Sequence, residues 1–299
     1  MPNRIWIAAL ALSGTLLFAA VNPQPGVEVQ MILTSADHMN HNPPALKAAD
    51  IAITDATITD WVPFEGGNNL ELFIVIDDSA DYDFAVRLQE LKRFVTSQPA
   101  SAAIGVAYIH DGELRIVENP TTDHQLAVRD LRSPSGSKTA NSYCALSELI
   151  QGWKTKSLRR EVVIVTAGVD ESATGGAVCV DAETATHDAE RAGVVVYALY
   201  NPPSDYVSKD WSNVDAGIVN LASVSYDTGG EAYFVGHTPT LSIEPFLADI
   251  TEHLAHQYLV KFRVTPMPDS AFQTLFVTSA TPDRELMKPE RIWVPAPAR

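Results

Sequence analysis

Residues 70–81 read LELFIVIDDSAD, and this stretch decides the fold. Its first seven residues form a nearly continuous apolar run, which is typical of a strand buried on both faces of a parallel sheet. Residues 82–97 then place Phe84, Leu88, Leu91 and Val95 at helical spacing. The stretch therefore predicts a strand that feeds a helix. Its acidic end lies at the carboxyl end of the strand, where open α/β sheets form their binding crevice.

The same alternation of short β-branched runs and longer amphipathic runs continues to residue 256. Further strands are predicted at 103–110, 161–166, 194–200 and 232–235, and further helices at 142–153, 181–192, 213–226 and 243–256. The dipeptide Asp111-Gly112 predicts a hairpin that adds residues 114–118 as an antiparallel edge. The fold class is thus α/β, with a doubly wound, mostly parallel sheet.

The two ends of the chain have a different pattern. Residues 27–34 and 51–61 before the α/β region, and 258–264, 273–279 and 291–294 after it, alternate like strands of antiparallel sheets. Neither end buries a face alone, so we expect both ends to pair into one small β-sandwich that flanks the α/β domain. The predicted divisions are 1–20, 21–67, 68–257 and 258–299.

Composition and the first residues bound the location and the partners. The chain has 299 residues, 46% hydrophobic and 19% charged, which is typical of a folded protein. Its net charge of −16 argues against nucleic acid and anionic membranes as partners. Residues 1–20, with Arg4 before an uncharged apolar run, predict a signal peptide, with an uncleaved anchor as the alternative. We therefore expect a secreted or periplasmic protein.

The acidic stretch resembles the von Willebrand factor A (vWA) domain, in which the first sheet strand ends in D-x-S-x-S. The resemblance extends to residues 143–146 (YCAL), 162–168 (VVIVTAG), 191–198 (RAGVVVYA) and 228–234 (TGGEAYF). The flanking residues 44–62 and 256–266 are similar to those of the VWFA-related family of acidobacteria. The resemblance implies an exported binding module more than a defined biochemical role.

In the vWA family, the D-x-S-x-S stretch belongs to a metal-ion-dependent adhesion site that holds Mg²⁺ and leaves one position for a carboxylate of the partner. The resemblance carries Asp77 and Ser79 over directly, whereas Asp81 replaces the second serine and Ala167 replaces an aspartate. Thr139 is one residue away from the family's threonine position. The implied ligands of Mg²⁺ or another divalent cation are therefore Asp77, Ser79, Asp81 and Thr139, in a degenerate site. The alternative is that Asp77 and Ser79 shape the loop, while Asp78 and Asp81 cap the next helix.

The sequence has two cysteines, Cys144 and Cys179. They form either a disulfide or two buried free thiols. In the topology that the resemblance implies, Cys144 lies in the first turn of a helix and Cys179 ends the loop after Thr166. Both then reach the same rim of the sheet, which favours a disulfide between them.

Other residues give weaker indications. His38-x-x-His41 and His253-x-x-His256 lack the glutamate of a zinc-protease motif and are interpreted as surface histidines. Residues 200–211 follow a parallel strand and are aromatic, so Tyr206 and Trp211 are candidate partner contacts.

The sequence has no nucleophile with a local base, and we do not expect an enzyme. The predicted function is binding of a protein or cell-envelope ligand, and a carboxylate-bearing ligand is one candidate. The alternatives are a periplasmic metal-dependent hydrolase that uses the same acidic stretch, and a metal-free structural scaffold.

Overall fold

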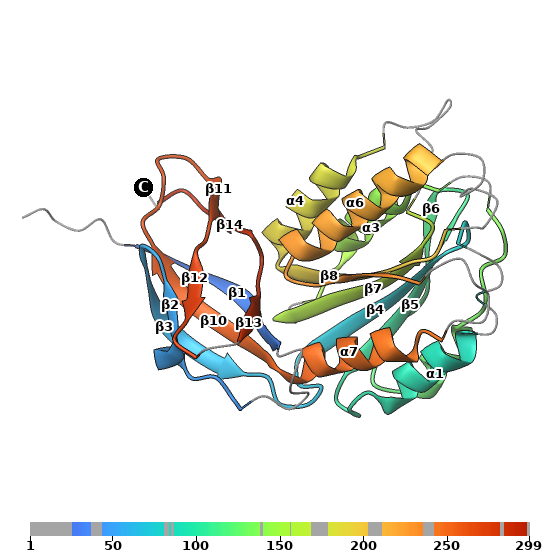
Figure 1. Cartoon of the computed structure of the whole chain (residues 1–299), viewed down its shortest axis with the longest axis horizontal. Coiled ribbons are helices and arrows are strands. Elements are labelled where there is room, and N and C mark those ends of the chain that lie inside the picture. The colour runs from blue at the N-terminus through green and yellow to red at the C-terminus, as the bar shows by residue number, and fades with distance from the viewer. Residues whose placement is uncertain are drawn as a thin grey trace, which may run out of the picture.

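The structure is a computed structural model that describes residues 26–36, 44–80, 84, 87–137, 140–155, 157–168, 179–202, 211–235, 242–281 and 284–297. Antiparallel strands gather at one end of the molecule, and a sheet covered by helices forms the other end (Figure 1). This is the predicted fold class. The predicted signal peptide lies outside the described residues.

The large sheet has six strands in the order β6-β5-β4-β7-β8-β9. Its strands are β4 (Leu70–Asp77), β5 (Ala103–His110), β6 (Glu113–Thr121), β7 (Arg159–Thr166), β8 (Val194–Tyr200) and β9 (Ala232–Phe234). All neighbours pair in parallel except β6, which is antiparallel to β5. Asp111 and Gly112 both have positive φ in the turn between β5 and β6, as the predicted hairpin requires.

Helices cover both faces of the sheet. They are α1 (Leu88–Ser97), α2 (His124–Asp130), α3 (Ser142–Gly152), α4 (Ala182–Ala192), α6 (Trp211–Asp227) and α7 (Glu244–Ala255). Helices α3, α4 and α6 lie on one face, and α1 and α7 lie on the other (Figure 1). The sequence pattern did not predict α2, which is short.

Side chains of the central strand β4 alternate between the two faces, as the period of a strand requires. Leu72, Ile74 and Ile76 belong to the core on the α1 and α7 side. Phe73 and Val75 belong to the core on the α3, α4 and α6 side. This alternation continues to the end of the strand and sets the direction of the acidic residues that follow.

Strands from both ends of the chain pair with one another, as predicted. Here β1 (Val27–Ala36) pairs with β10 (Gln257–Val264) and β13 (Glu285–Met287), and β10 also pairs with β3 (Ala56–Pro63). Two further sheets pair β2 (Ile51–Ile53) with β12 (Val277–Ser279), and β11 (Ala271–Thr274) with β14 (Arg291–Val294). We call these strands together the antiparallel unit. They enclose an apolar core of their own.

Two of the predicted end strands are in fact interrupted. Residues 51–61 divide into β2 and β3 at a turn where Asp55 has a φ of 56°. Residues 273–279 likewise divide between β11 and β12. The apolar positions change there from Ile51 and Ile53 to Ala56 and Ile58, a shift of one residue that the sequence analysis did not interpret as a turn.

A buried polar network joins the sheet to the antiparallel unit. Arg159 at the start of β7 is fully buried, and its Nε lies 3.2 Å from Glu161 Oε1 and 2.6 Å from Gln257 Oε1. Its guanidinium also donates to the backbone carbonyl oxygens of Gly66 and Leu254. Because Gln257 opens β10, this network fixes the antiparallel unit to the amino-terminal end of the sheet. The opposite, carboxyl-terminal end carries the acidic stretch.

Candidate functional site

The acidic stretch lies at the switch point of the sheet. Strands β4 and β7 are neighbours, and the chain continues from β4 to β5 on one side and from β7 to β8 on the other. In doubly wound sheets the binding crevice forms at the carboxyl ends of two such strands. Asp77 ends β4 and Thr166 ends β7, so the topology brings both residues to that crevice.

Asp77 is fully buried and is the centre of a hydrogen-bond network. Its Oδ2 accepts hydrogen bonds from the hydroxyls of Ser142 and Thr166, both at 2.9 Å, and its Oδ1 accepts one from the backbone N–H of Ser79. The two hydroxyl oxygens are themselves 2.7 Å apart. Asp77 therefore ties together the central strand, the neighbouring strand β7 and the first residue of α3.

Burial raises the pKa of Asp77 above its ordinary value, and the hydrogen bonds from Ser79, Thr166 and Ser142 partly offset this effect. The carboxylate is thus held by neutral donors. A buried carboxylate of this kind fixes the segments that donate to it, and loss of a donor lowers the free energy of unfolding.

Asp78 points to the opposite face, as the alternation along β4 requires. Both of its carboxylate oxygens accept hydrogen bonds from Arg132, at 2.6 and 2.9 Å, and Oδ2 lies 2.8 Å from His110 Nδ1. The backbone N–H of Ser135 adds another hydrogen bond. Among the described residues, the helix that follows is α1, which begins at Leu88 with Arg87 as its N-cap, so Asp78 does not cap it and the interpretation of Asp78 as the cap of that helix was wrong.

The partners of Asp78 determine its charge. Burial alone raises the pKa of Asp78, but the hydrogen bonds from Arg132, Ser135 and His110 outweigh burial and bring it to about 2. The Arg132 side chain is 45% exposed, and its guanidinium lies 3.8 Å from the centroid of the Tyr108 ring. A partly exposed cation thus lies beside the switch-point crevice of an otherwise acidic chain.

The second residue after β7 is a glycine, Gly168, because a side chain would not fit at this position. Gly168 has a φ of 64°, and a Cβ at this position would lie 2.4 Å from the Tyr200 ring. It also accommodates the Thr166 hydroxyl, which accepts a hydrogen bond from the Gly168 backbone N–H. Between them, Ala167 is buried and supplies no ligand atom from its side chain.

The described residues do not complete a Mg²⁺ site at Asp77. Both oxygens of Asp77 already accept hydrogen bonds from protein groups, and the carboxylate of Asp78 is paired with Arg132. The Ser79 hydroxyl is buried and has no hydrogen-bond partner within the described part of the chain, so it is one suitable oxygen. The other two predicted ligands, Asp81 and Thr139, lie outside the described residues.

The structure confirms the disulfide between Cys144 and Cys179, with the two Cα atoms 5.5 Å apart. Cys144 lies in the first turn of α3, only two residues after Ser142, as predicted. The bridge therefore joins the end of the loop that follows Thr166 to α3. The first residue of this helix, Ser142, donates a hydrogen bond to Asp77.

The remaining predicted contacts are only partly described. Trp211 is the first residue of α6 rather than the end of a loop, and the structure does not describe its side chain. Tyr206, His38 and His41 lie outside the described residues. His253 is 3% exposed, so its interpretation as a surface histidine was wrong. The signal missed there was its position on the apolar face of α7.

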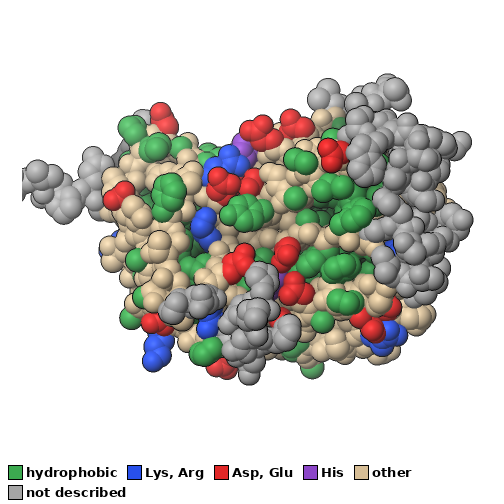
Figure 2. Space-filling view, viewed as in Figure 1, with side chains coloured by type: hydrophobic (Ala, Val, Ile, Leu, Met, Phe, Trp, Pro, Cys, Tyr) green, Lys and Arg blue, Asp and Glu red, His purple; other side chains and the backbone are tan. Residues whose placement is uncertain are grey.

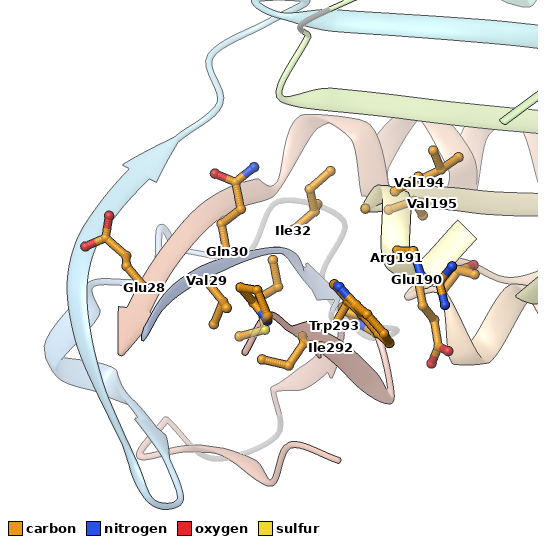
Figure 3. Close-up of a pocket in the computed structure, with 16 residues that line it drawn as sticks. Glu28, Val29, Gln30, Ile32, Glu190, Arg191, Val194, Val195, Ile292 and Trp293 are labelled. Atoms are coloured by element: carbon orange, nitrogen blue, oxygen red, sulfur yellow. The ribbon is translucent and has the colours of Figure 1, made fainter. Parts of the chain in front are cut away.

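A cavity of about 260 Å³ lies away from the crevice, where α4 and β8 meet the antiparallel unit. Figure 3 shows Trp293 between the side chains of β1 and those of Glu190 and Arg191. The Arg191 guanidinium lies 4.3 Å from the Trp293 ring centroid, and Glu190 forms an ion pair with Arg291. Burial raises the pKa of Glu190 to about 7 against the opposing effect of Arg291. These contacts pack the two parts of the molecule together.

The fold and the switch-point site together define a vWA-like α/β protein with an added antiparallel unit. No described helix is long and apolar enough to cross a membrane. No known protein-family model matches the chain, and no curated protein matches it either.

Solved structures give distant likenesses. An aerotolerance-related membrane protein from Bacteroides fragilis is 18% identical, with a TM-score of 0.45, over 62% of this chain and 98% of that one. Proximal thread matrix protein 1 from the mussel byssus is 14% identical, with a TM-score of 0.45, over 64% and 49%. The SpRpn10 VWA domain is 14% identical, with a TM-score of 0.36, over 61% and 93%. The fold assignment rests on the strand order itself.

Proposed function

We propose that this chain is an exported binding module that recognises a protein or cell-envelope ligand at the switch-point crevice. The observation that carries the proposal is the hydrogen-bond network around Asp77. In it, the Ser142 and Thr166 hydroxyls and the Ser79 backbone N–H bind the carboxylate and fix the segments that form the crevice. Because these groups join β4, β7 and α3, the crevice has a fixed shape that a ligand can recognise.

We further propose that binding there does not depend on a metal at Asp77. In the vWA family a metal ion presents positive charge to a carboxylate of the partner. Here Arg132 is the partly exposed positive group beside the same crevice, and His110, 31% exposed, lies next to it. A carboxylate-bearing ligand would meet the exposed edge of this guanidinium. The aromatic residues Tyr206 and Trp211 belong to the segment that we expect to add apolar contacts.

A selection from a displayed random-peptide library tests the proposal. The oxidised chain is the target, EDTA is present throughout, and the Arg132→Gln variant serves for counter-selection. We expect acidic peptides that bind the wild-type chain at least 10-fold more tightly than the variant, equivalent to about 1.4 kcal/mol.

The matched control is Arg129→Gln, because Arg129 is an exposed arginine close by that pairs with Asp130 instead of Asp78. This variant should bind the selected peptides as the wild-type chain does. A parallel selection with Mg²⁺ in place of EDTA would overturn the metal independence if it yielded peptides that bind only when Mg²⁺ is present. Hydrolysis of ester, phosphoester or peptide substrates, abolished by Asp77→Asn, would overturn the assignment as a binding module.

A further inference from the structure

Three side chains that bind metals in other proteins converge beside the edge strand β9, remote from the switch point. Asp249 and His253 are four residues apart on α7 and therefore share one face of the helix. Glu231 immediately precedes β9. One ligand atom from each of the three lies within 4.8 Å of the others. Figure 2 shows acidic side chains gathered near the middle of this face of the molecule.

The distances between these atoms suit an ion better than direct hydrogen bonds. His253 Nε2 lies 3.8 Å from Asp249 Oδ1 and 4.0 Å from Glu231 Oε2, both longer than a hydrogen bond. Nitrogen and oxygen ligands lie at about 2.0–2.2 Å from Zn²⁺, which separates neighbouring ligands by roughly 3–4 Å. Small rotations of the side chains would bring all three atoms to those distances.

The histidine is held in place by its surroundings. Its side chain is 4% exposed, and its ring stacks on Tyr197 with centroids 6.0 Å apart. An imidazole beside two carboxylates offers the mixed nitrogen and oxygen ligands that Zn²⁺ accepts. The position of His253 is therefore set by packing rather than by the exposed surface of α7.

One carboxylate also has an orienting partner. The Tyr233 hydroxyl donates a hydrogen bond of 2.7 Å to Asp249 Oδ2, which leaves Oδ1 directed at His253. Such outer partners are a regular feature of metal sites, because they fix the direction of the ligand.

Solvent reaches the cluster through its two carboxylates, because the side chains of Glu231 and Asp249 are 38% and 34% exposed. Glu231 also lines a neighbouring cavity of about 400 Å³ together with Tyr226, Glu285 and Lys288. It lies where β9 and α6 meet β13 of the antiparallel unit. Two partly exposed carboxylates and one buried imidazole would therefore give an ion access from solvent and a closed inner side.

We propose that Glu231, Asp249 and His253 bind a Zn²⁺ ion at the partly exposed edge between β9 and α7. The imidazole nitrogen favours Zn²⁺ over Mg²⁺ and Ca²⁺, which prefer ligand sets made of oxygen alone. The ion would join β9 to α7 close to the antiparallel unit. This site is separate from Asp77, so the proposal does not depend on the function proposed for the crevice.

The competing explanation is a proton on His253, which would balance the two carboxylates without a metal. The test uses the oxidised full-length chain after dialysis against EDTA, with Zn²⁺ itself as the probe in calorimetric titration. Co²⁺ in place of Zn²⁺ gives a visible absorption that reports directly on ligation. We expect one ion per chain, and at least a 100-fold loss of affinity in Asp249→Asn and in Glu231→Gln.

Controls separate ligation from folding. Glu231 is 38% exposed in its side chain, so Glu231→Gln should unfold at the wild-type temperature when no metal is present. His256→Gln changes a histidine three residues beyond His253, just past the end of α7, and should retain full affinity. A wild-type chain that binds no Zn²⁺, or Zn²⁺ binding that is unchanged in Glu231→Gln and Asp249→Asn, would overturn the proposal and leave the proton as the balancing charge.

Discussion

The Ser142 hydroxyl donates a 2.9 Å hydrogen bond to the fully buried carboxylate of Asp77. Ser142 is the first residue of α3, and Asp77 is the last residue of β4. The bond therefore connects the start of a helix to the central strand at the switch point. Because the Thr166 hydroxyl binds the same carboxylate oxygen, the two hydroxyls together set the shape of the crevice.

Replacement of Ser142 by alanine should destabilise the chain by about 1–3 kcal/mol, because a buried carboxylate loses one of its donors. Urea unfolding at pH 7 measures the change. Thr96→Ala is the control, since the Thr96 hydroxyl is an exposed group that bonds only to its own helix, and it should cost no more than about 0.5 kcal/mol. Equal stability of the two variants would show that the Ser142 hydroxyl does not hold Asp77.

The fold was predictable from the sequence because its signals are local. Leu70–Asp77 is apolar over its whole length, and Gly193 adopts the left-handed conformation that ends α4. The pairing of the two chain ends was also predictable, because short alternating strands at each end have no other partner. The break at Asp55 was missed because its one signal, a one-residue shift of the apolar alternation, contains neither glycine nor proline to mark a turn.

The candidate site was predictable only in part. Asp77 and Ser79 were identified from their match to the vWA motif at the end of a buried strand, whereas the opposite directions of Asp77 and Asp78 were not predicted, although the strand period accounts for them. Arg132 and Ser142 were missed because they are 54 and 65 residues away from the aspartates they bind. No local pattern records such contacts, which arise only when the rim loops converge.

The Arg132–Asp78 pair predicts resistance to acid. Asp78 has a lowered pKa, so the stability it contributes is fully present above about pH 4 and is lost as the pH falls towards 2. Arg132→Gln should remove about 2–3 kcal/mol at pH 7 and move the acid-unfolding midpoint to a higher pH. Circular dichroism during acid titration measures that midpoint.

The comparison for this pair is Arg129→Gln, which removes an exposed ion pair with Asp130. It should leave the acid-unfolding midpoint unchanged, because exposed pairs contribute little. If the Arg132 and Arg129 variants unfolded at the same pH, the low pKa of Asp78 would have to come from Ser135 and His110 alone.

The disulfide should stabilise the chain substantially. It closes a separation of 35 residues, which corresponds to about 3–4 kcal/mol from the restricted unfolded chain. Thiol titration of the denatured, unreduced chain should find no free thiol, and reduction should lower the urea midpoint. The double variant Cys144→Ser, Cys179→Ser should unfold like the reduced wild-type chain and should not respond to reductant. Two reactive thiols in the denatured, unreduced chain would contradict the bridge.

Glu190 predicts a second pH dependence of opposite sign. Its pKa is raised to about 7 in the folded chain, whereas the ordinary value is 4.5. The folded state therefore binds more protons between these values, so stability is greatest below about pH 4.5 and falls as the pH rises to 7, by up to about 3 kcal/mol. Urea unfolding at pH 5 and pH 7.5 measures the difference. Glu190→Gln should reduce this difference, because glutamine does not titrate, while Glu183→Gln on the exposed side of the same helix should leave it unchanged. A wild-type chain with equal stability at the two pH values would show that Arg291 keeps Glu190 ionised throughout.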